Sequence, residues 1–353
     1  WRYRDAACTA LGCLLSSPLV QTDESIRNTL NEALTGVLLN LVNDPEPHVA
    51  ISASWALAQY CDSCPTVILQ HLPAVNTAIM GSLNNPRSRP TANICRALYQ
   101  LAQNLNFDSE ESMQEAFQEF GLSHLFQPGV HPLGSLFTEL VQALLKITET
   151  CTDATLLINS YEALTELIRC GASNNVEHLT SLLNVLGARL LQTMNANVAA
   201  SSVANYDDYR NRSQGLLCGA LSMLIAKLPP NVVFEKINDL LNVLTSILNN
   251  DPSVTTEALC AIEAIIYSVG PQFQPFAHAM MTKLIDLVGQ YGESGSTCER
   301  CFTVIGTLIS KADFQDAKLF DNYVAGLLNI LNQSTVDRQA KIAAADAFLD
   351  IAL

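Results

Sequence analysis

The sequence predicts an all-α fold, a solenoid of about seven to eight stacked helix pairs. The first observation is a recurring phrase in which a small residue precedes a large apolar one. The copies lie 46, 41, 66, 57, 41, 42 and 44 residues apart, and most steps match the roughly 40 to 47 residues of a two-helix repeat. The second is a helix-like segment before each copy, often ended by Asn, Asp or Pro. The copies are Ala10-Leu11, Ala56-Leu57, Ala97-Leu98, Ala163-Leu164, Ala220-Leu221, Ala261-Ile262, Thr303-Val304 and Ala347-Phe348.

The clearest repeat consists of a first helix over residues 26–42 and a second from about residue 48 to 61. Apolar residues in the first helix recur at i, i+3 and i+4 spacings, which is typical of a helix with one buried face. They are Ile26, Leu30, Leu34, Val37, Leu38 and Leu41. Asn43-Asp44-Pro45 then stops the helix, because proline cannot continue it. Similar stops at Asn84-Asn85-Pro86 and Asn249-Asn250-Asp251-Pro252 extend the pattern, and two helices per period is the HEAT-repeat arrangement.

The whole chain, residues 1–353, is expected to form a single HEAT-repeat array that belongs to a longer solenoid. Its 49% hydrophobic residues would be buried between neighbouring repeats and not in one closed core. Two long steps between phrases indicate insertions, which we expect to be solvated loops at residues 106–132 and 195–206.

The charge balance argues against nucleic acid as a partner. The chain has 34 acidic and 19 basic residues, a net charge of −15, whereas binding to phosphates requires Lys and Arg. A basic protein partner fits better. The sequence contains no run of 18 apolar residues and no signal peptide pattern, so we expect a soluble intracellular protein without membrane insertion.

No motif in the sequence indicates catalysis, a cofactor or a metal. The pairs Cys61/Cys64 and Cys298/Cys301 have C-x-x-C spacing, but neither has a second pair of ligands nearby, so buried free thiols are expected. Phosphate loops, dinucleotide fingerprints and nucleophile elbows are absent from the sequence. We therefore expect a non-enzymatic binding protein.

Helical geometry predicts which face of the second helices points outward. A residue two positions before a core residue lies roughly 200° away from it, which places Trp55 opposite Leu57. Trp55 is then either an exposed aromatic anchor on the concave side or a residue packed against the neighbouring repeat.

When this two-residue offset is applied to the other second helices, and residues within one helical turn are added, the selected residues form a mostly acidic strip. It predicts a groove for a basic peptide, because carboxylates pair with Lys and Arg and aromatic rings stack on guanidinium groups. A solvated helix face is the alternative for any single carboxylate. The candidate cargo- or adaptor-binding residues are Trp55, Gln59, Asp62, Asn93, Arg96, Gln100, Glu162 and Glu166, with Glu257, Glu299, Phe302, Asp346 and Asp350 further along.

A series of short phrases resembles the importin-β family of nuclear transport receptors over nearly the whole chain, across that family's middle and C-terminal-side HEAT repeats. The phrases occur in the family's order and at similar spacing. They are Trp1-Arg-Tyr-Arg-Asp-Ala-Ala7, Leu11-Gly12-Cys13, Ala53-Ser-Trp55-Ala-Leu57, Ala92-Asn-Ile-Cys95, Ser160-Tyr-Glu-Ala-Leu164, Gln214-Gly-Leu-Leu-Cys218 and Phe348-Leu-Asp-Ile-Ala-Leu353.

This resemblance implies a receptor that moves between cytoplasm and nucleus through the nuclear pore. It implies binding to an importin-α-type adaptor or a basic cargo signal, contact with Phe-Gly nucleoporins, and release by the GTP form of Ran. Trp55 would be a family tryptophan that contacts the basic segment. Arg96 stands where the family has a second tryptophan, and this cation would repel a basic ligand unless a carboxylate such as Asp62 pairs with it.

The resemblance also makes the later carboxylates and Phe302 possible contacts of Ran or cargo. The alternative reading is a HEAT scaffold of another class, such as a phosphatase regulatory scaffold or a vesicle-coat subunit. Uneven repeats and a charged strip on the second helices favour the transport receptor.

Overall fold

The computed structural model describes residues 1–15, 17, 24–119, 121–170, 175–195, 206–250, 252–291, 295–313, 316–332 and 338–352. Every regular element within these ranges is a helix, so the all-α prediction is confirmed. The chain divides into two compact units, residues 1–174 (unit 1) and 175–353 (unit 2). No helix in the described ranges is both long enough and apolar enough to cross a membrane.

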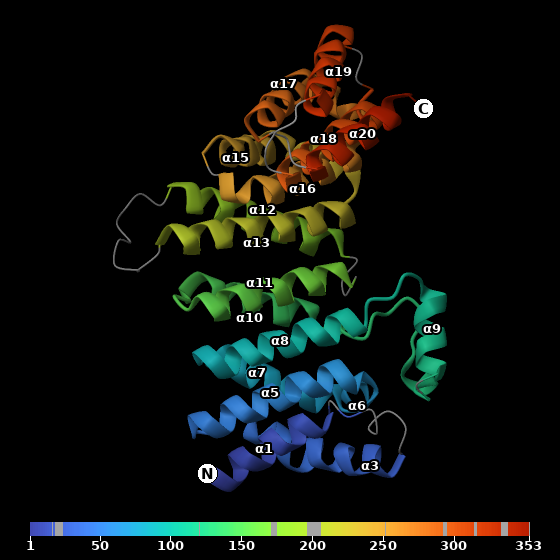
Figure 1. The fold of residues 1–353 in the computed structure, drawn as a ribbon. Coiled ribbons are helices and arrows are strands. Elements are labelled where there is room, and N and C mark those ends of the chain that lie inside the picture. The colour runs from blue at the N-terminus through green and yellow to red at the C-terminus, as the bar shows by residue number, and fades with distance from the viewer. Residues whose placement is uncertain are drawn as a thin grey trace. The chain divides into compact units, whose positions relative to one another are not determined.

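Unit 1 stacks helix pairs, as Figure 1 shows. The second helix of each pair, which we call the B helix, packs on the B helix of the next pair: α1 on α5, α5 on α8 and α8 on α11. The B helices are α1 (Arg2–Leu15), α5 (Pro47–Ser63), α8 (Ser88–Asn104) and α11 (Ala154–Arg169). The first helices are α3 (Glu24–Ala33), continued by a π-helical turn (Leu34–Leu38) and α4 (Leu39–Leu41), then α6 (Pro65–Gln70) with α7 (Leu72–Asn84), and α10 (Phe137–Thr150).

Local sequence explains where these helices begin and end. Pro47 occupies the first turn of α5, where its missing N–H is not needed. The Asp153 carboxylate caps α11 by accepting a hydrogen bond from the Leu156 amide at 2.9 Å. Between the helices of a pair, the buried Tyr60 hydroxyl donates to the Leu30 carbonyl at 2.9 Å. The predicted pair at residues 26–42 and 48–61 therefore forms with nearly the expected bounds.

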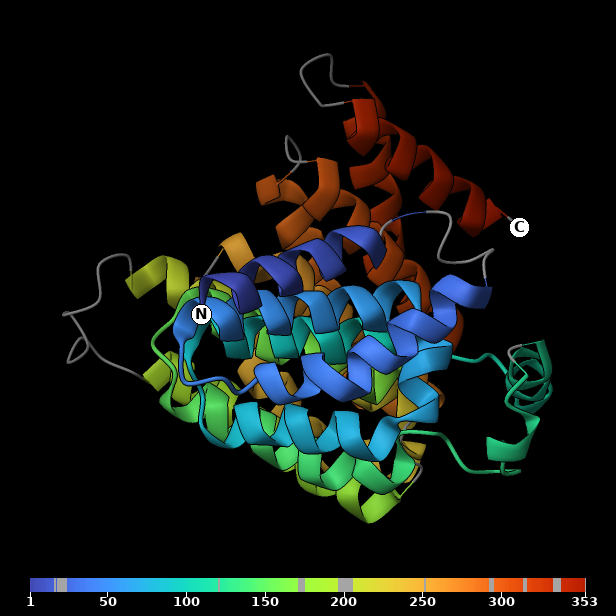
Figure 2. The same cartoon turned by 90° about the horizontal axis from the view of Figure 1, so that it is seen from below.

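Residues 106–132 are not the plain loop that the sequence predicts, because they contain the helix α9 (Glu110–Glu119). Both views show α9 standing apart from the stack of unit 1 (Figures 1 and 2). Its apolar side packs within the excursion, where the Phe117 ring lies 6.4 Å from that of Phe107 and 6.1 Å from that of Phe126. The three phenylalanines supply a small core of their own, which supports a helix that has no repeat to pack on. Most of the predicted loop at 195–206 lies outside the described residues.

Unit 2 repeats the arrangement of pairs. Its B helices pack in the order α13 on α16, α16 on α18 and α18 on α20. They are α13 (Tyr206–Lys227), α16 (Thr255–Val269), α18 (Gly295–Lys311) and α20 (Arg338–Ala352). The first helices are α12 (Val176–Asn195), α14 (Pro230–Glu235) with α15 (Ile237–Asn250), α17 (Gln274–Tyr291) and α19 (Ala317–Asn332). Gly270 ends α16 at φ 56°, a backbone conformation that glycine adopts without strain.

Candidate functional site

The B helices share one register, which identifies their outward face. Each has a buried residue, here called the reference position, at the centre of its packed face. The reference positions are Ala56 in α5, Ala97 in α8, Ala163 in α11, Ala220 in α13, Ala261 in α16, Val304 in α18 and Ala347 in α20. In unit 1 the residue directly before the reference position is Trp55, Arg96 or Glu162; Trp55 is partly exposed and the other two are exposed. The structure thus places all three on the open side of their helices.

Trp55 is both partly exposed and packed against the neighbouring repeat. Its six-membered ring lies directly over Gly12 of α1, so closely that a Cβ added at Gly12 would overlap the ring. Gly12 is itself buried. The ring therefore packs against the neighbouring repeat across the joint between α1 and α5 and still presents some surface to solvent, while its role as an aromatic anchor stays a prediction.

Asn93 has a structural role that the sequence analysis did not foresee. Its side-chain amide donates to the Ile51 carbonyl and to the Ser54 hydroxyl, both at 3.2 Å, and so ties α8 to α5. The amide of Asn159 does the same one joint later, donating to the Ala92 carbonyl at 3.0 Å. Asn93 is therefore partly committed to holding the repeats together.

The other polar candidates of α5 and α8 remain accessible. Gln59 and Gln100 are partly exposed, and Asp62 is exposed at the C-terminal end of α5. Asp62 is fixed in place through its backbone, since its carbonyl accepts from the Asn104 side chain at 3.1 Å.

The open sides of α8 and α11 carry charges of both signs, Arg96 on α8 and Glu162 on α11. Desolvation raises the pKa of Glu162, and the positive charge of Arg96 on the preceding helix opposes that rise. The carboxylate that Arg96 influences is thus Glu162, whereas the sequence suggested Asp62.

Glu166 is a correction to the predicted strip, because its side chain is buried and only 1% exposed. Its Oε2 lies 3.5 Å from Nε of Arg169, one helical turn later, and its Oε1 accepts no hydrogen bond. Burial raises the pKa of Glu166, partly offset by Arg169. A helical offset cannot reveal this, because it gives a direction around one helix and not what lies in that direction.

Phe302 is a second correction, since it belongs to the core. It is 4% exposed, and its ring centroid lies 6.3 Å from that of Tyr323 in α19. The sequence phrase at Thr303-Val304 is one residue out of register: Val304 occupies the reference position and Thr303 is the exposed residue before it. One residue is 100° around a helix, enough to turn an outward position into a buried one. The phrase in α1 is also out of register, since Ala10 is exposed and the buried residue Gly12 lies two positions later.

The remaining candidates of unit 2 differ in exposure. Glu299 and Asp346 are exposed, and Glu257 is partly exposed between α16 and α13. Asp350 falls within α20, but its side chain lies outside the described part of the structure.

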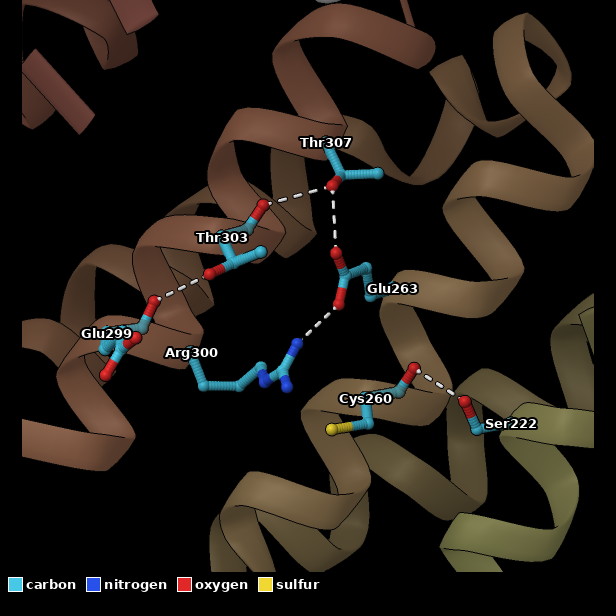
Figure 3. Close-up of polar contacts among 7 residues, drawn as sticks. All are labelled: Ser222, Cys260, Glu263, Glu299, Arg300, Thr303 and Thr307. Carbon is cyan, nitrogen blue, oxygen red and sulfur yellow. Dashed lines mark hydrogen bonds and ion pairs between the residues drawn. The ribbon is translucent and has the colours of Figure 1, made fainter. Parts of the chain in front are cut away.

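A polar network between α16 and α18 was missed by the sequence analysis. Arg300 Nη1 lies 2.8 Å from Glu263 Oε2, and the Thr307 hydroxyl donates to Glu263 Oε1 at 3.2 Å. Figure 3 shows Glu263 reaching between these two residues of α18. The signal was present in the sequence as opposite charges on consecutive B helices, Glu263 two residues after one reference position and Arg300 four before the next.

Most of the cysteines, including both C-x-x-C pairs, are buried. Burial raises the pKa of Cys301 to about 12 and that of Cys298 to about 11, so both thiols stay protonated at neutral pH. All eleven cysteines lie in the described ranges, and none of them forms a disulfide. Within the described ranges, no group of three or more His, Cys, Asp or Glu side chains is arranged to hold a metal ion.

A largely apolar pocket of about 410 Å³ opens between the first helices α12 and α15. Leucines from both helices form much of its wall, and the polar residues Lys236, Asp239 and Asn242 border it. Gly187 widens it, because a Cβ at this position would meet only Leu240 Cδ2, at 4.0 Å. Such a pocket suits a single apolar or aromatic side chain.

Comparison with known proteins identifies the family. Residues 73–353 match the family model described as importin subunit beta-1-like TPR repeats, and residues 1–60 match a HEAT-like repeat. The chain belongs to the importin-β family. Importin subunit beta-1 of Arabidopsis thaliana is 27% identical over 368 residues, and that of Schizosaccharomyces pombe is 24% identical over 366 residues. Both alignments cover all of this chain and 39% of the relative.

Solved structures of the family have the same fold. Importin beta crystallised in a polyethylene glycol condition superimposes with a TM-score of 0.81 at 23% identity, covering 100% of this chain and 40% of the other. The Kap95:Nup1 complex gives 0.81 at 21% identity, with 100% and 38% covered. The chain therefore spans about two-fifths of these importin-β proteins, and all of it has their helix-pair architecture.

Proposed function

We propose that this chain is the ligand-binding part of a nuclear import receptor, whose B helices hold a basic segment of an importin-α-type adaptor or of a cargo. Membership of the importin-β family supports transport over a phosphatase scaffold or coat subunit. The observation that carries the proposal is Trp55, partly exposed and held in place over Gly12. Its ring can cover the stem of a Lys or Arg side chain while the exposed Asp62 attracts the charge.

The other two partners follow from the same family. The pocket between α12 and α15 is proposed to take the aromatic side chain of a Phe-Gly nucleoporin, and a solved relative is a Kap95:Nup1 complex. Release by the GTP form of Ran is proposed because Kap95p is reported to act on the switch loops of RanGDP. Glu299, Asp346 and Asp350 stay predicted contacts for Ran or cargo. The receptor would work in the cytoplasm, the nucleus and the pore, without catalysis or a cofactor.

The test is a titration of the chain with a labelled Lys/Arg-rich peptide at low and high salt. We expect saturable binding that weakens with salt and becomes about fivefold or more weaker in Trp55→Ala, the scale of a significant interface truncation. Trp1→Ala is the matched control, because Trp1 is the other tryptophan and is 50% exposed.

Unfolding curves of both variants show whether loss of the ring over Gly12 damages the fold. Trp55→Phe keeps an aromatic ring and should retain most of the binding. If the folded wild-type protein does not bind the peptide, or if Trp55→Ala and Trp1→Ala both bind it as tightly as wild type does, the basic-segment proposal is wrong. A separate titration with a Phe-Gly peptide tests the pocket. If Gly187→Leu abolishes binding of this peptide and Gly289→Leu leaves it unchanged, the pocket assignment is supported.

A further inference from the structure

The pocket between α12 and α15 has more room than one aromatic side chain fills. Its volume is about 410 Å³, whereas an apolar cavity of about 150 Å³ is enough to hold benzene. Sites for whole small molecules have volumes of about 300 to 1,000 Å³. The pocket between α12 and α15 therefore has the size of a site for an apolar small molecule.

The apolar lining runs from the surface of the first helices to the B helix behind them. The helix α12 packs on both α13 and α15. Leu221 of α13 and Leu244 of α15 line the pocket and are fully buried. Leu191 of α12 lines it as well but is 47% exposed. A long apolar chain in the pocket would cover Leu191, and removing this apolar surface from water is favourable.

Lys236, the residue between α14 and α15, brings a positive charge to the rim of the pocket. Its side chain lines the pocket and is partly exposed. In the described part of the chain, its ammonium group forms no ion pair and no hydrogen bond. A lysine can pack its alkyl stem along an apolar wall and keep the ammonium group in water. An anionic head group at the rim would therefore meet a cation that has no other partner there.

Asp239 lies three residues after Lys236 and limits the charge that the rim accepts. It also lines the pocket, and it is exposed. Charges interact more strongly where water screens them less, so the less exposed Lys236 outweighs Asp239. A ligand with one negative charge suits this rim, whereas Asp239 would repel a second negative charge.

We propose that this pocket binds a free aliphatic monocarboxylic acid, whose chain lies along the leucines and whose carboxylate pairs with Lys236. An alkyl chain can follow the lining to its inner end without a polar backbone, which would need hydrogen-bond partners that leucines lack. This acid site goes beyond the proposed transport function. One consequence rests on that function: bound acid would exclude the phenylalanine of a nucleoporin, because both would occupy the same space.

The first experiment asks whether such an acid binds in the pocket. Decanoate, kept below its micelle concentration, is titrated into the chain. Calorimetry measures the affinity, and NMR follows the backbone amide resonance of Gly187. We expect saturable binding that shifts this resonance. Binding should weaken by about fourfold for each methylene removed in the shorter acids nonanoate and octanoate.

Two glycine variants test the location of the acid. Gly187→Leu fills the pocket and should abolish the binding of decanoate. Gly289→Leu in α17 is the matched control, because a Cβ at Gly289 would meet no atom within 4 Å, and it should bind decanoate as wild type does. If the folded wild type shows no saturable binding, or if Gly187→Leu binds decanoate as tightly as wild type, the proposal is overturned.

The second experiment tests the head group through the charges at the rim. We expect about three- to fivefold weaker decanoate binding in Lys236→Gln, the scale of a partly exposed ion pair, and about twofold tighter binding in Asp239→Asn. Lys283→Gln is the matched control, since Lys283 is a partly exposed lysine of another first helix, α17. Decanol, which has the same chain without the charge, should not distinguish these variants from wild type. Equal losses for the two lysine variants would reject the pairing with Lys236.

The third experiment separates the acid site from the nucleoporin assignment. A labelled Phe-Gly peptide is bound to the chain, and decanoate is added. Displacement of the peptide at decanoate concentrations that match its measured affinity would support a shared pocket. Binding of both ligands at once would reject the exclusion. If decanoate binds at Gly187 but the peptide does not bind at all, the peptide assignment fails while the acid site remains.

Discussion

The α5–α8 and α8–α11 joints of unit 1 differ in chemistry from the α16–α18 joint of unit 2. In unit 1, neutral amides of Asn93 and Asn159 bond directly to backbone carbonyls of the preceding helix. In unit 2, the ion pair of Glu263 and Arg300 connects α16 to α18, and at the α13–α16 joint the buried Oε2 of Glu257 accepts no hydrogen bond.

This difference indicates which contacts between B helices a charged ligand can disturb. A hydrogen bond from an amide to a backbone carbonyl is insensitive to salt and offers no charge for which a ligand can compete. An ion pair whose members are 33% and 24% exposed is screened by salt and accessible to competing charges. We therefore expect the α5–α8 and α8–α11 joints of unit 1 to hold their geometry and the α16–α18 joint of unit 2 to respond to bound charge.

The largest effect should come from the packing of Trp55. Gly12→Ala places a Cβ inside the volume of the Trp55 ring, and overpacking of this kind costs about 2 kcal/mol. Gly306→Ala in α18 is the matched control, because its Cβ meets no atom within 4 Å and alanine favours the helix by up to about 1 kcal/mol. Urea unfolding measures both. Similar effects in the two variants would show that Trp55 does not depend on close contact with α1.

Removal of an amide tie in unit 1 should come next. Asn93→Ala loses the bonds to Ile51 and Ser54 that tie α8 to α5, at a cost of about 1 kcal/mol. The loss should be the same in low and high salt, because no charge is involved. Urea unfolding at both salt concentrations tests this, and a strong salt dependence would contradict the distinction between the units.

The ion pair of unit 2 should contribute less and depend on salt. Arg300→Gln is expected to cost about 0.5 to 1 kcal/mol at low ionic strength, and less at 1 M salt, where charges are screened over about 3 Å. The measurement is the difference in unfolding free energy between variant and wild type as salt is raised. An unchanged difference would show that packing of the arginine stem, and not its charge, holds α18 to α16.

The smallest effect concerns the acid side of the pH profile. The Glu46 amide and the Arg4 guanidinium hold the pKa of Asp44 below its usual value. The folded-state pKa is thus lower than the unfolded one, so this contribution is complete above the unfolded pKa and is lost as the pH falls through the folded pKa. Asp44→Asn should flatten the loss of stability of unit 1 in that acid range. A profile as steep as that of wild type would assign the acid sensitivity to other carboxylates.

Much of this architecture could be predicted because it depends on the local spacing of apolar residues. Apolar spacing along residues 26–42 and 48–61 specified a helix pair, and the helical angle alone placed Arg96 and Glu162 on the open side. The order of the phrases indicated the family before any contact was known. Such properties depend on residues a few positions apart, so the sequence by itself determined them.

Only the tertiary structure decided which group each outward side chain meets. Trp55 lies on Gly12, Asn93 is hydrogen-bonded to α5, and Glu257 lies over Gly215 with a buried Oε2 that accepts no hydrogen bond. Phe302 and the excursion around α9 were misjudged for the same reason. A shift of one residue in register turns a side chain by 100°, and contacts between helices about 40 residues apart are set by how the repeats stack, which no local pattern encodes.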